Sequence, residues 1–335
     1  MEFGPVPVAE AVGAVLAHSV ALPGGSFRKG RVLTRDDVAA LAAGGIAVVT
    51  VARSGPDDIG EDEAAAALAR ALVPDPGAAG LRLATPHTGR VNIHAESFGL
   101  ARLDVSRLHA VNAVSELISL ATVAPWTSMG PGGLVATVKI IPYAIDAGLV
   151  VAAEAAGRGA LTLAPITVTD ADLIVTTHAA GSAEDTGKGP AAIEARLSGL
   201  GMRLARVVEV PHEIGPLAAA IAEARAGMVL VLTASATSDP RDTGPEALRR
   251  AGGRVVRVGM PVDPGNLLFY GSLADGRPAI GLPGCARSPA RNGADHVLER
   301  LAAGLDLAPQ EVAAMGVGGL LKESPGRRQP RERKL

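Results

Sequence analysis

Over residues 165–312, short apolar runs alternate with longer stretches in which apolar residues recur at helical spacing. Apolar runs bounded by turn residues predict buried strands, and an apolar period near 3.6 residues predicts helices. Strands are predicted at 173–176, 202–210, 228–232, 254–258, 267–271 and 278–282. Helices are predicted at 189–200, 216–226, 245–251 and 288–305. This alternation predicts an α/β domain built on a mostly parallel sheet with helices on both faces.

Residues 1–60 predict a small mixed α+β unit that precedes this domain. Thr34 is placed as an N-cap, and two aspartates follow it in the first turn of a helix that runs through Leu41. A glycine pair ends this helix, and the apolar run at 46–51 predicts a buried strand.

Residues 81–160 predict a second small α+β unit, with a helix over 105–120. Before it, an acidic and then alanine-rich segment at 57–72 predicts a helix, and the proline- and glycine-rich segment at 73–80 predicts a linker. Residues 322–335 hold six basic and two acidic residues without an apolar period, which predicts a disordered basic tail.

The composition excludes several classes of protein. A net charge of −2 and only seven aromatic residues remove the basic field and the stacking surfaces that bind nucleic acids. The single cysteine, Cys285, excludes an internal disulfide framework and a multi-cysteine metal site. The chain starts without a signal-peptide pattern, and prolines and glycines interrupt its longest uncharged stretch. We therefore expect a cytoplasmic protein without a membrane segment.

The loop that follows the predicted strand at 228–232 carries the clearest chemical signal. It is small and polar and leads into the helix predicted at 245–251, so its N–H groups and hydroxyls are placed to meet an anion at a helix N-terminus. Its candidate ligand-binding residues are Ser235, Thr237 and Ser238. Asp239 and Asp242 would repel a bare phosphate, so they indicate a metal-bridged phosphate or a ligand with polar donors. The alternative is an ordinary turn in which Asp242 caps the helix or pairs with Arg241.

Other loops follow predicted parallel strands and are expected at the same edge of the sheet, where α/β domains bind their ligands. They lie at 177–188, 211–213 and 283–288. Their candidate ligand-binding residues are Glu213, Pro283, Gly284, Cys285 and Ser288.

Each of these candidates has a structural alternative. Ser288 is either the N-cap of the last helix or a hydroxyl that contacts the ligand. Cys285 is either a thiol with a lowered pKa at a helix start or a small buried filler. Glu213 is either a site residue or part of a solvated loop.

Taken together, the loops resemble the molybdopterin-binding domain shared by molybdopterin adenylyltransferases and molybdotransferases. The segment from Thr233 to Ala247 is similar, above all in its second half, to the family loop T-G-G-T-G/S-x-x-P-R-D-x-T-P-E-A. The segments 263–271 and 281–288 resemble the family pattern K-P-G-K-P…F-G…L-P-G-N-P-x-S. Residues 28–51 resemble the segment that leads into this domain in molybdotransferases.

The resemblance implies roles for individual residues. Asp242 matches the functional aspartate of the family, and Pro264 and Gly265 match its Pro-Gly pair. Ala234, Ser235 and Thr237 stand where glycines are usual, and the lysines that flank the Pro-Gly pair in the family are absent. Glycines let backbone amides approach a phosphate closely, so these departures favour binding over catalytic turnover.

The overall likeness is to a subgroup of molybdopterin-binding proteins whose members are often fused to a cytidylyltransferase-type nucleotidyltransferase. It implies a homo-oligomer that binds molybdopterin or its nucleotide form during cofactor biosynthesis or hand-off, with a nucleotidyltransferase or a molybdoenzyme as partner. Two alternatives stay open. One is a molybdopterin adenylyltransferase or molybdotransferase that uses Mg²⁺ and ATP, in which Asp242, with Asp239, holds the metal. The other is a structural dimerisation module without a ligand.

Overall fold

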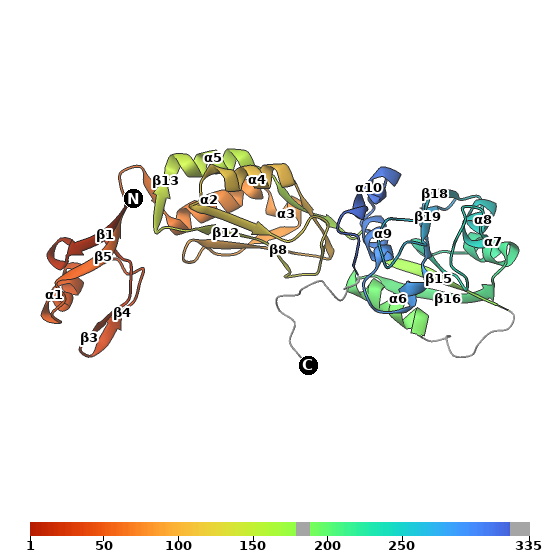
Figure 1. Ribbon diagram of the computed structural model, residues 1–335, viewed down its shortest axis with the longest axis horizontal. Helices are drawn as coiled ribbons and strands as arrows, with labels where there is room; N and C mark the ends of the chain where they lie inside the picture. Colours follow the sequence, from red (N-terminus) through yellow and green to blue (C-terminus); the bar gives the residue numbers. More distant parts are fainter. Residues whose placement is uncertain (179–187, 322–335) are drawn as a thin grey trace. The chain divides into compact units, whose positions relative to one another are not determined.

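The computed structural model describes residues 1–178 and 188–321 (Figure 1). These residues divide into two compact units. The N-terminal unit contains residues 1–97 and 101–164, and the C-terminal unit contains residues 98–100 and 165 onward. Within the described ranges, every helix is too short or too polar to cross a membrane. The tail predicted at 322–335 lies outside the described residues.

The first part of the N-terminal unit consists of short antiparallel strands and one helix. Its elements are β1 (Glu2–Pro7), η1 (Val8–Glu10), β2 (Val15–Leu16), β3 (Val20–Leu22), β4 (Gly25–Phe27), α1 (Arg35–Ala43) and β5 (Val48–Arg53). Strand β5 pairs with β1 on one side and with β2 on the other, and β3 and β4 form a hairpin. Thr34 and Asp37 form a capping box at the start of α1, which confirms the predicted helix start.

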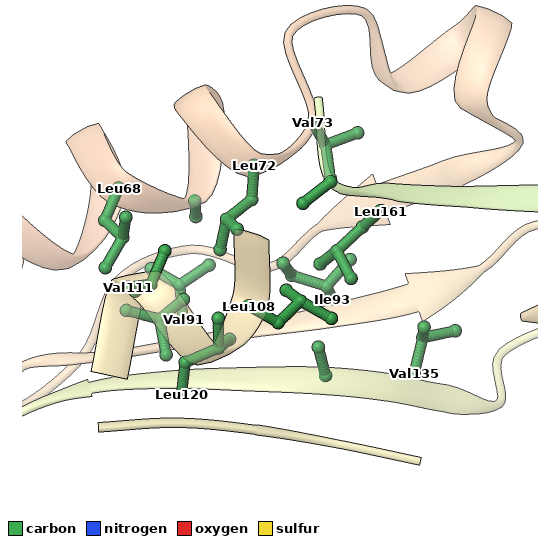
Figure 2. Packing of buried hydrophobic residues seen from close by; sticks show 14 of the residues in the cluster. Leu68, Leu72, Val73, Val91, Ile93, Leu108, Val111, Leu120, Val135 and Leu161 are labelled. Atoms are coloured by element: carbon green, nitrogen blue, oxygen red, sulfur yellow. The ribbon is translucent and has the colours of Figure 1, made fainter. Parts of the chain in front are cut away.

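The second part of the N-terminal unit packs helices on a four-stranded antiparallel sheet in the order β10-β12-β8-β7. Its elements are β6 (Asp58–Gly60), α2 (Glu61–Leu72), α3 (Pro76–Ala79), β7 (Leu81–Leu83), β8 (Arg90–Ala95), β9 (Gly99–Leu103), α4 (Val105–Val114), β10 (Ile118–Thr122), β11 (Ser128–Met129), β12 (Leu134–Ile140), β13 (Ala144–Asp146), α5 (Ala147–Gly157) and β14 (Leu161–Pro165). Leu68 and Leu72 of α2 pack with Val91 and Ile93 of β8 in one buried core (Figure 2).

Two sequence predictions in this region are wrong. The predicted linker at 73–80 contains the short helix α3, and Val73 is fully buried in the core, so this segment is part of the packed unit. The helix predicted over 105–120 ends at Val114 and is followed by β10. The side chain of Asn112 bonds both the N–H and the C=O of Leu120, which stabilises the turn, and alternate residues of β10 are buried against the sheet.

The C-terminal unit is built on a six-stranded sheet in the order β16-β15-β17-β20-β19-β18. Its elements are β15 (Asp170–Thr177), α6 (Lys188–Gly199), β16 (Arg203–Pro211), α7 (Ile214–Ala222), β17 (Met228–Leu232), α8 (Thr243–Arg250), β18 (Arg254–Val258), β19 (Phe269–Ser272), β20 (Pro278–Leu282), η2 (Gly284–Arg287), α9 (Gly293–Ala302), α10 (Pro309–Ala313) and η3 (Ala314–Gly316). The first four strands in this order are parallel, whereas β19 is antiparallel to both of its neighbours. The sheet is therefore mixed, and the predicted hairpin between β19 and β20 is confirmed.

Helices cover both faces of this sheet, and successive strand residues therefore pack in different cores. Leu173 and Val175 of β15 pack in one core with residues of α6 and α9. Ile174, between them, packs in a second core with residues of α7 and α8. Strand β17 repeats this alternation, with residues buried on both sides. Near-continuous apolar strands of this kind are typical of a sheet that is buried on both faces.

Candidate functional site

The loops singled out in the sequence lie at one edge of the six-stranded sheet. The parallel strands β16, β15, β17 and β20 end at this edge, so the loops that follow them begin there. Phe269 pairs with Gly281 near the end of β20 and with Val258 at the end of β18. The segment 259–268 therefore connects β18 to β19 at the same edge. We call this edge of the sheet the carboxyl edge.

Asp242 in the loop after β17 is the N-cap of α8. Its Oδ1 accepts the N–H of Thr243 at 2.7 Å, and its Oδ2 accepts the N–H of Ser238 at 3.0 Å. Both carboxylate oxygens are thus hydrogen-bonded to the backbone, as in the structural alternative considered from the sequence. Asp242 thus connects Ser238 of the loop to Thr243 of the helix, and its charge lies at the start of α8.

Asp239 pairs with Arg241, two residues further along the loop. The Arg241 Nε lies 3.0 Å from the Asp239 Oδ1, and both side chains are exposed. The side-chain bond from Arg241 holds the pKa of Asp239 below its usual range. Arg241 therefore pairs with Asp239 and not with Asp242, and this exposed pair stabilises the loop little.

The predicted hydroxyls of the loop differ in access. Ser235 and Ser238 are exposed at the carboxyl edge, whereas Thr237 is buried. Glu213, in the loop after β16, is also exposed and stands at the N-cap position of α7 without a side-chain cap. Ser235, Ser238 and Glu213 are accessible to a ligand at this edge, and Thr237 contributes packing.

Pro264 and Gly265 lie against the N-terminus of α9. The Gly293 N–H donates to the Pro264 carbonyl at 2.8 Å, and the Asp263–Pro264 peptide is cis. Gly265 has φ +132°, and a Cβ there would stand 2.3 Å from the Gly293 backbone nitrogen. The conformation and the close contact both require glycine at this position. The Pro-Gly pair thereby joins the segment 259–268 to the loop that follows β20.

Pro283 and Gly284 begin the turn η2, and the predicted start of the last helix is wrong. Asn292, not Ser288, is the N-cap of α9, and it forms a capping box with Asp295. Ser288 ends η2, where its Oγ accepts the N–H of Ala290 at 3.3 Å. The helix could not begin at Ser288 because η2 and the capped turn at Asn292 occupy the segment between β20 and α9.

The thiol of Cys285 in η2 is partly buried. This burial raises the pKa of the Cys285 thiol above its usual value. Of the two alternatives for Cys285, a raised pKa agrees with a small, partly buried side chain and not with a reactive thiol at a helix start.

Arg196 of α6 shapes the loop after β20, and the sequence did not single it out. Its Nε donates to the Asp295 Oδ1 at 2.7 Å, and the two side chains are only 8% and 9% exposed. Its Nη1 and Nη2 donate to three carbonyls of the loop, those of Ala286, Ser288 and Ala290. One buried guanidinium thus fixes both the loop and the capped start of α9.

Thr176 of β15 links three loops at the carboxyl edge. Its Oγ1 accepts the N–H of Ala234 at 2.8 Å and lies 2.8 Å from the Nδ1 of His212. The rings of His212 and His178 meet edge to face, with centroids 5.2 Å apart. Burial lowers the pKa of His212, the proximity of His178 lowers it further, and the proximity of Asp242 raises it. The rest of the loop after β15, at 179–187, lies outside the described residues.

The carboxylates and histidines of this edge do not form a ready metal site. In the ranges that the structure describes, no three His, Cys, Asp or Glu residues converge as metal ligands. Each oxygen of Asp242 accepts one backbone N–H and keeps a second lone pair. Mg²⁺ is often held by one or two carboxylates together with substrate phosphates, so a metal here would depend on the ligand for its coordination.

A cavity of about 270 Å³ lies at the other end of the strands β18, β19 and β20. Arg254, Ser272 and Pro278, which stand at those strand ends, line it together with Asp306. None of the predicted site residues lines this cavity. Substitutions of its lining residues can therefore distinguish a ligand bound in this cavity from one bound at the carboxyl edge.

Comparisons with known proteins give one family model and several solved structures. Residues 5–53 match a domain of unknown function, DUF8806. No curated protein matches the chain. The chain is similar to a molybdenum cofactor biosynthesis protein from Pyrococcus furiosus at 14% identity and a TM-score of 0.24, over 91% of this chain and 64% of that one. It is also similar to a molybdopterin biosynthesis protein from Mycobacterium abscessus at 13% identity and a TM-score of 0.28, over 41% of this chain and 92% of that one.

The chain thus spans 64% of the length of the Pyrococcus furiosus protein.

Proposed function

We propose that the C-terminal unit binds molybdopterin or its nucleotide form at the carboxyl edge, in molybdenum cofactor biosynthesis or hand-off. One observation carries this proposal. The three segments that resemble the family motifs, 233–247, 263–271 and 281–288, are far apart in the sequence and reach the same edge of one sheet. Ligands of open α/β sheets bind beyond the carboxyl ends of the strands.

Binding without turnover is favoured by the loss of positive charge at the carboxyl edge. Asp242 has a structural role there as the N-cap of α8, and both of its oxygens accept backbone N–H groups. The family lysines that flank the Pro-Gly pair are replaced by Asp263 and Asn266, which removes positive charge from the edge. The exposed hydroxyls of Ser235 and Ser238 and the backbone of their loop remain to contact a ligand.

The test is to incubate the full-length protein with molybdopterin, Mg²⁺-ATP and molybdate, and to follow pterin retention by equilibrium dialysis and ATP consumption in parallel. The proposal expects retention without ATP consumption. Absence of retention by the wild-type protein would refute it. ATP consumption that is lost in Asp242→Asn would instead support the adenylyltransferase or molybdotransferase alternative.

Variants at Asp242 separate its charge from its structural role. Asparagine is a good N-cap residue but keeps only one of the two backbone bonds of Asp242, whereas alanine removes both and costs about 1 kcal/mol. We therefore expect Asp242→Asn to retain the pterin within a few-fold of wild type and Asp242→Ala to bind it more weakly because the loop loosens. Asp306→Asn, at the cavity on the opposite edge, is the matched control and is expected to leave retention unchanged.

A further inference from the structure

The link through Thr176 determines which nitrogen of His212 carries a proton. The Thr176 side chain is buried, with 1% of its residue surface exposed, and the N–H of Ala234 occupies one lone pair of its hydroxyl. A hydroxyl has a single proton, and the Nδ1 of His212 at 2.8 Å is an acceptor within reach. If Nδ1 were protonated instead, the buried Thr176 proton would lack an acceptor among the described residues, which is unfavourable. The arrangement therefore favours neutral His212 with its proton on Nε2.

The hydrogen bonds of Thr176 also connect three neighbouring strands at the carboxyl edge. Thr176 lies near the end of β15, and His212 and Ala234 follow the ends of its two neighbours in the sheet, β16 and β17. The His212 N–H also donates to the Thr177 carbonyl at 2.8 Å, so the backbone of this residue is held as well. A side chain fixed at both its backbone and its ring is preorganised to make a directed contact.

We propose that His212 donates a hydrogen bond from Nε2 to a phosphate oxygen of the ligand, and that Thr176 is the residue that positions it. This inference rests on the proposed function, because the phosphate ester of molybdopterin supplies the acceptor. Among the described residues, the hydrogen bonds of the His212 ring involve Nδ1, which is paired with Thr176, and leave Nε2 to donate to the ligand in this proposal. Two ionisable groups lie near the ring, His178 at the edge of the imidazole and Asp242 in the loop after β17. Because His212 is neutral in this arrangement, its contact with the phosphate is a hydrogen bond and not an ion pair.

The tautomer is tested without any ligand. Long-range ¹H–¹⁵N NMR of protein labelled in its seven histidines reports which ring nitrogen is protonated, and the spectrum of His212→Gln assigns the His212 signals. We expect a proton on Nε2 in the wild-type protein and in Thr176→Ser, which keeps the hydroxyl. In Thr176→Val the hydroxyl is lost, and we expect a mixture of tautomers. A wild-type His212 protonated on Nδ1 would overturn the assignment of Thr176.

The contact with the ligand is tested by molybdopterin affinity. A glutamine amide reaches the position of the histidine Nε2, whereas an asparagine amide reaches only that of Nδ1. Loss of one hydrogen bond to a charged phosphate corresponds to a loss of affinity of about ten- to a hundred-fold. We expect this loss for His212→Asn and His212→Ala and a smaller loss for His212→Gln. Equal affinity in all three variants and wild type would overturn the inference and leave the proposed function intact.

Inorganic pyrophosphate separates the two proposals. If the wild-type protein fails to retain molybdopterin but pyrophosphate shifts the His212 Nε2–H signal, the proposed function fails and the phosphate contact stands. If neither molybdopterin nor pyrophosphate shifts that signal, the phosphate contact is refuted. Thr176→Val should weaken the response to pyrophosphate, and Thr176→Ser should preserve it.

Discussion

Replacing Arg196 by methionine should destabilise the C-terminal unit strongly, because it removes a buried cation and leaves its partner behind. The guanidinium bonds Asp295 at 2.7 Å and also donates to the carbonyls of Ala286, Ser288 and Ala290. Methionine fills a similar volume, so the change removes charge and hydrogen bonds more than packing.

The expected cost follows from burial. Breaking a buried pair by removing one partner costs about 3–5 kcal/mol, whereas losing an exposed pair costs about 0–1 kcal/mol. The matched control is Arg203→Met, because Arg203 also bonds an aspartate, Asp170, at 2.5 Å but its side chain is 71% exposed. We expect a difference of at least about 2 kcal/mol between the variants, from the burial of the Arg196 pair together with its additional carbonyl bonds.

The measurement is urea unfolding followed by a probe of the C-terminal unit. The only tryptophan, Trp126, belongs to the N-terminal unit, so hydrogen exchange of peptides from α9 is the suitable probe. Equal stability losses in Arg196→Met and Arg203→Met would refute the reasoning. If Arg196→Met does not fold, Arg196→Lys keeps the charge but not the forked donor, and a cost of about 2 kcal/mol is expected from the lost carbonyl bonds.

Three other predictions concern the same unit. Gly265→Ala should cost at least about 2 kcal/mol, because the new Cβ would stand 2.3 Å from the Gly293 nitrogen. Gly276→Ala, also at positive φ but with no atom within 4 Å, should cost about 1 kcal/mol in the same urea titration, and equal costs would contradict the close-contact argument. Burial and nearby arginines lower the pKa of His296 to about 4, so the folded state keeps this ring neutral and stability falls as pH drops from about 6.5 to 4. His296→Gln should remove up to about 3 kcal/mol of that decline, and an unchanged pH profile would argue against it. Cys285 should react with iodoacetamide at pH 8 more slowly than a free thiol, because its pKa is raised, and reaction at the free-thiol rate would be inconsistent with that burial.

The strands of the C-terminal unit were predictable because their apolar runs are short and bounded by turn residues. The predicted strands at 228–232, 254–258 and 278–282 match β17, β18 and β20, including their ends. Helix boundaries were less predictable, since side-chain caps decide them. Asn292 and Asp242 determine where α9 and α8 begin through side-chain hydrogen bonds. The spacing of apolar residues gives no information about these bonds.

Residues that act across the fold could not be predicted from local patterns. Arg196 contacts a loop about ninety residues away in sequence, and Thr176 reaches a loop about sixty residues away. One signal for Arg196 was present, because it lies at helical spacing from the buried Ala192, Ile193 and Leu200. A charged residue on the apolar side of a helix indicates a buried partner, since an unpaired charge there would be too costly.

The loop after β17 has a backbone conformation that residues other than glycine can adopt. No residue of 233–242 has positive φ, so this backbone does not require glycine. Ala234, where the family has glycine, uses its N–H to bond Thr176, and the Cβ-bearing Thr237 is packed and buried. Under the proposed function, the side chains that replace glycine would keep the loop amides farther from a phosphate. The proposed imidazole donor at His212, positioned by Thr176, would then supply a hydrogen bond in their place.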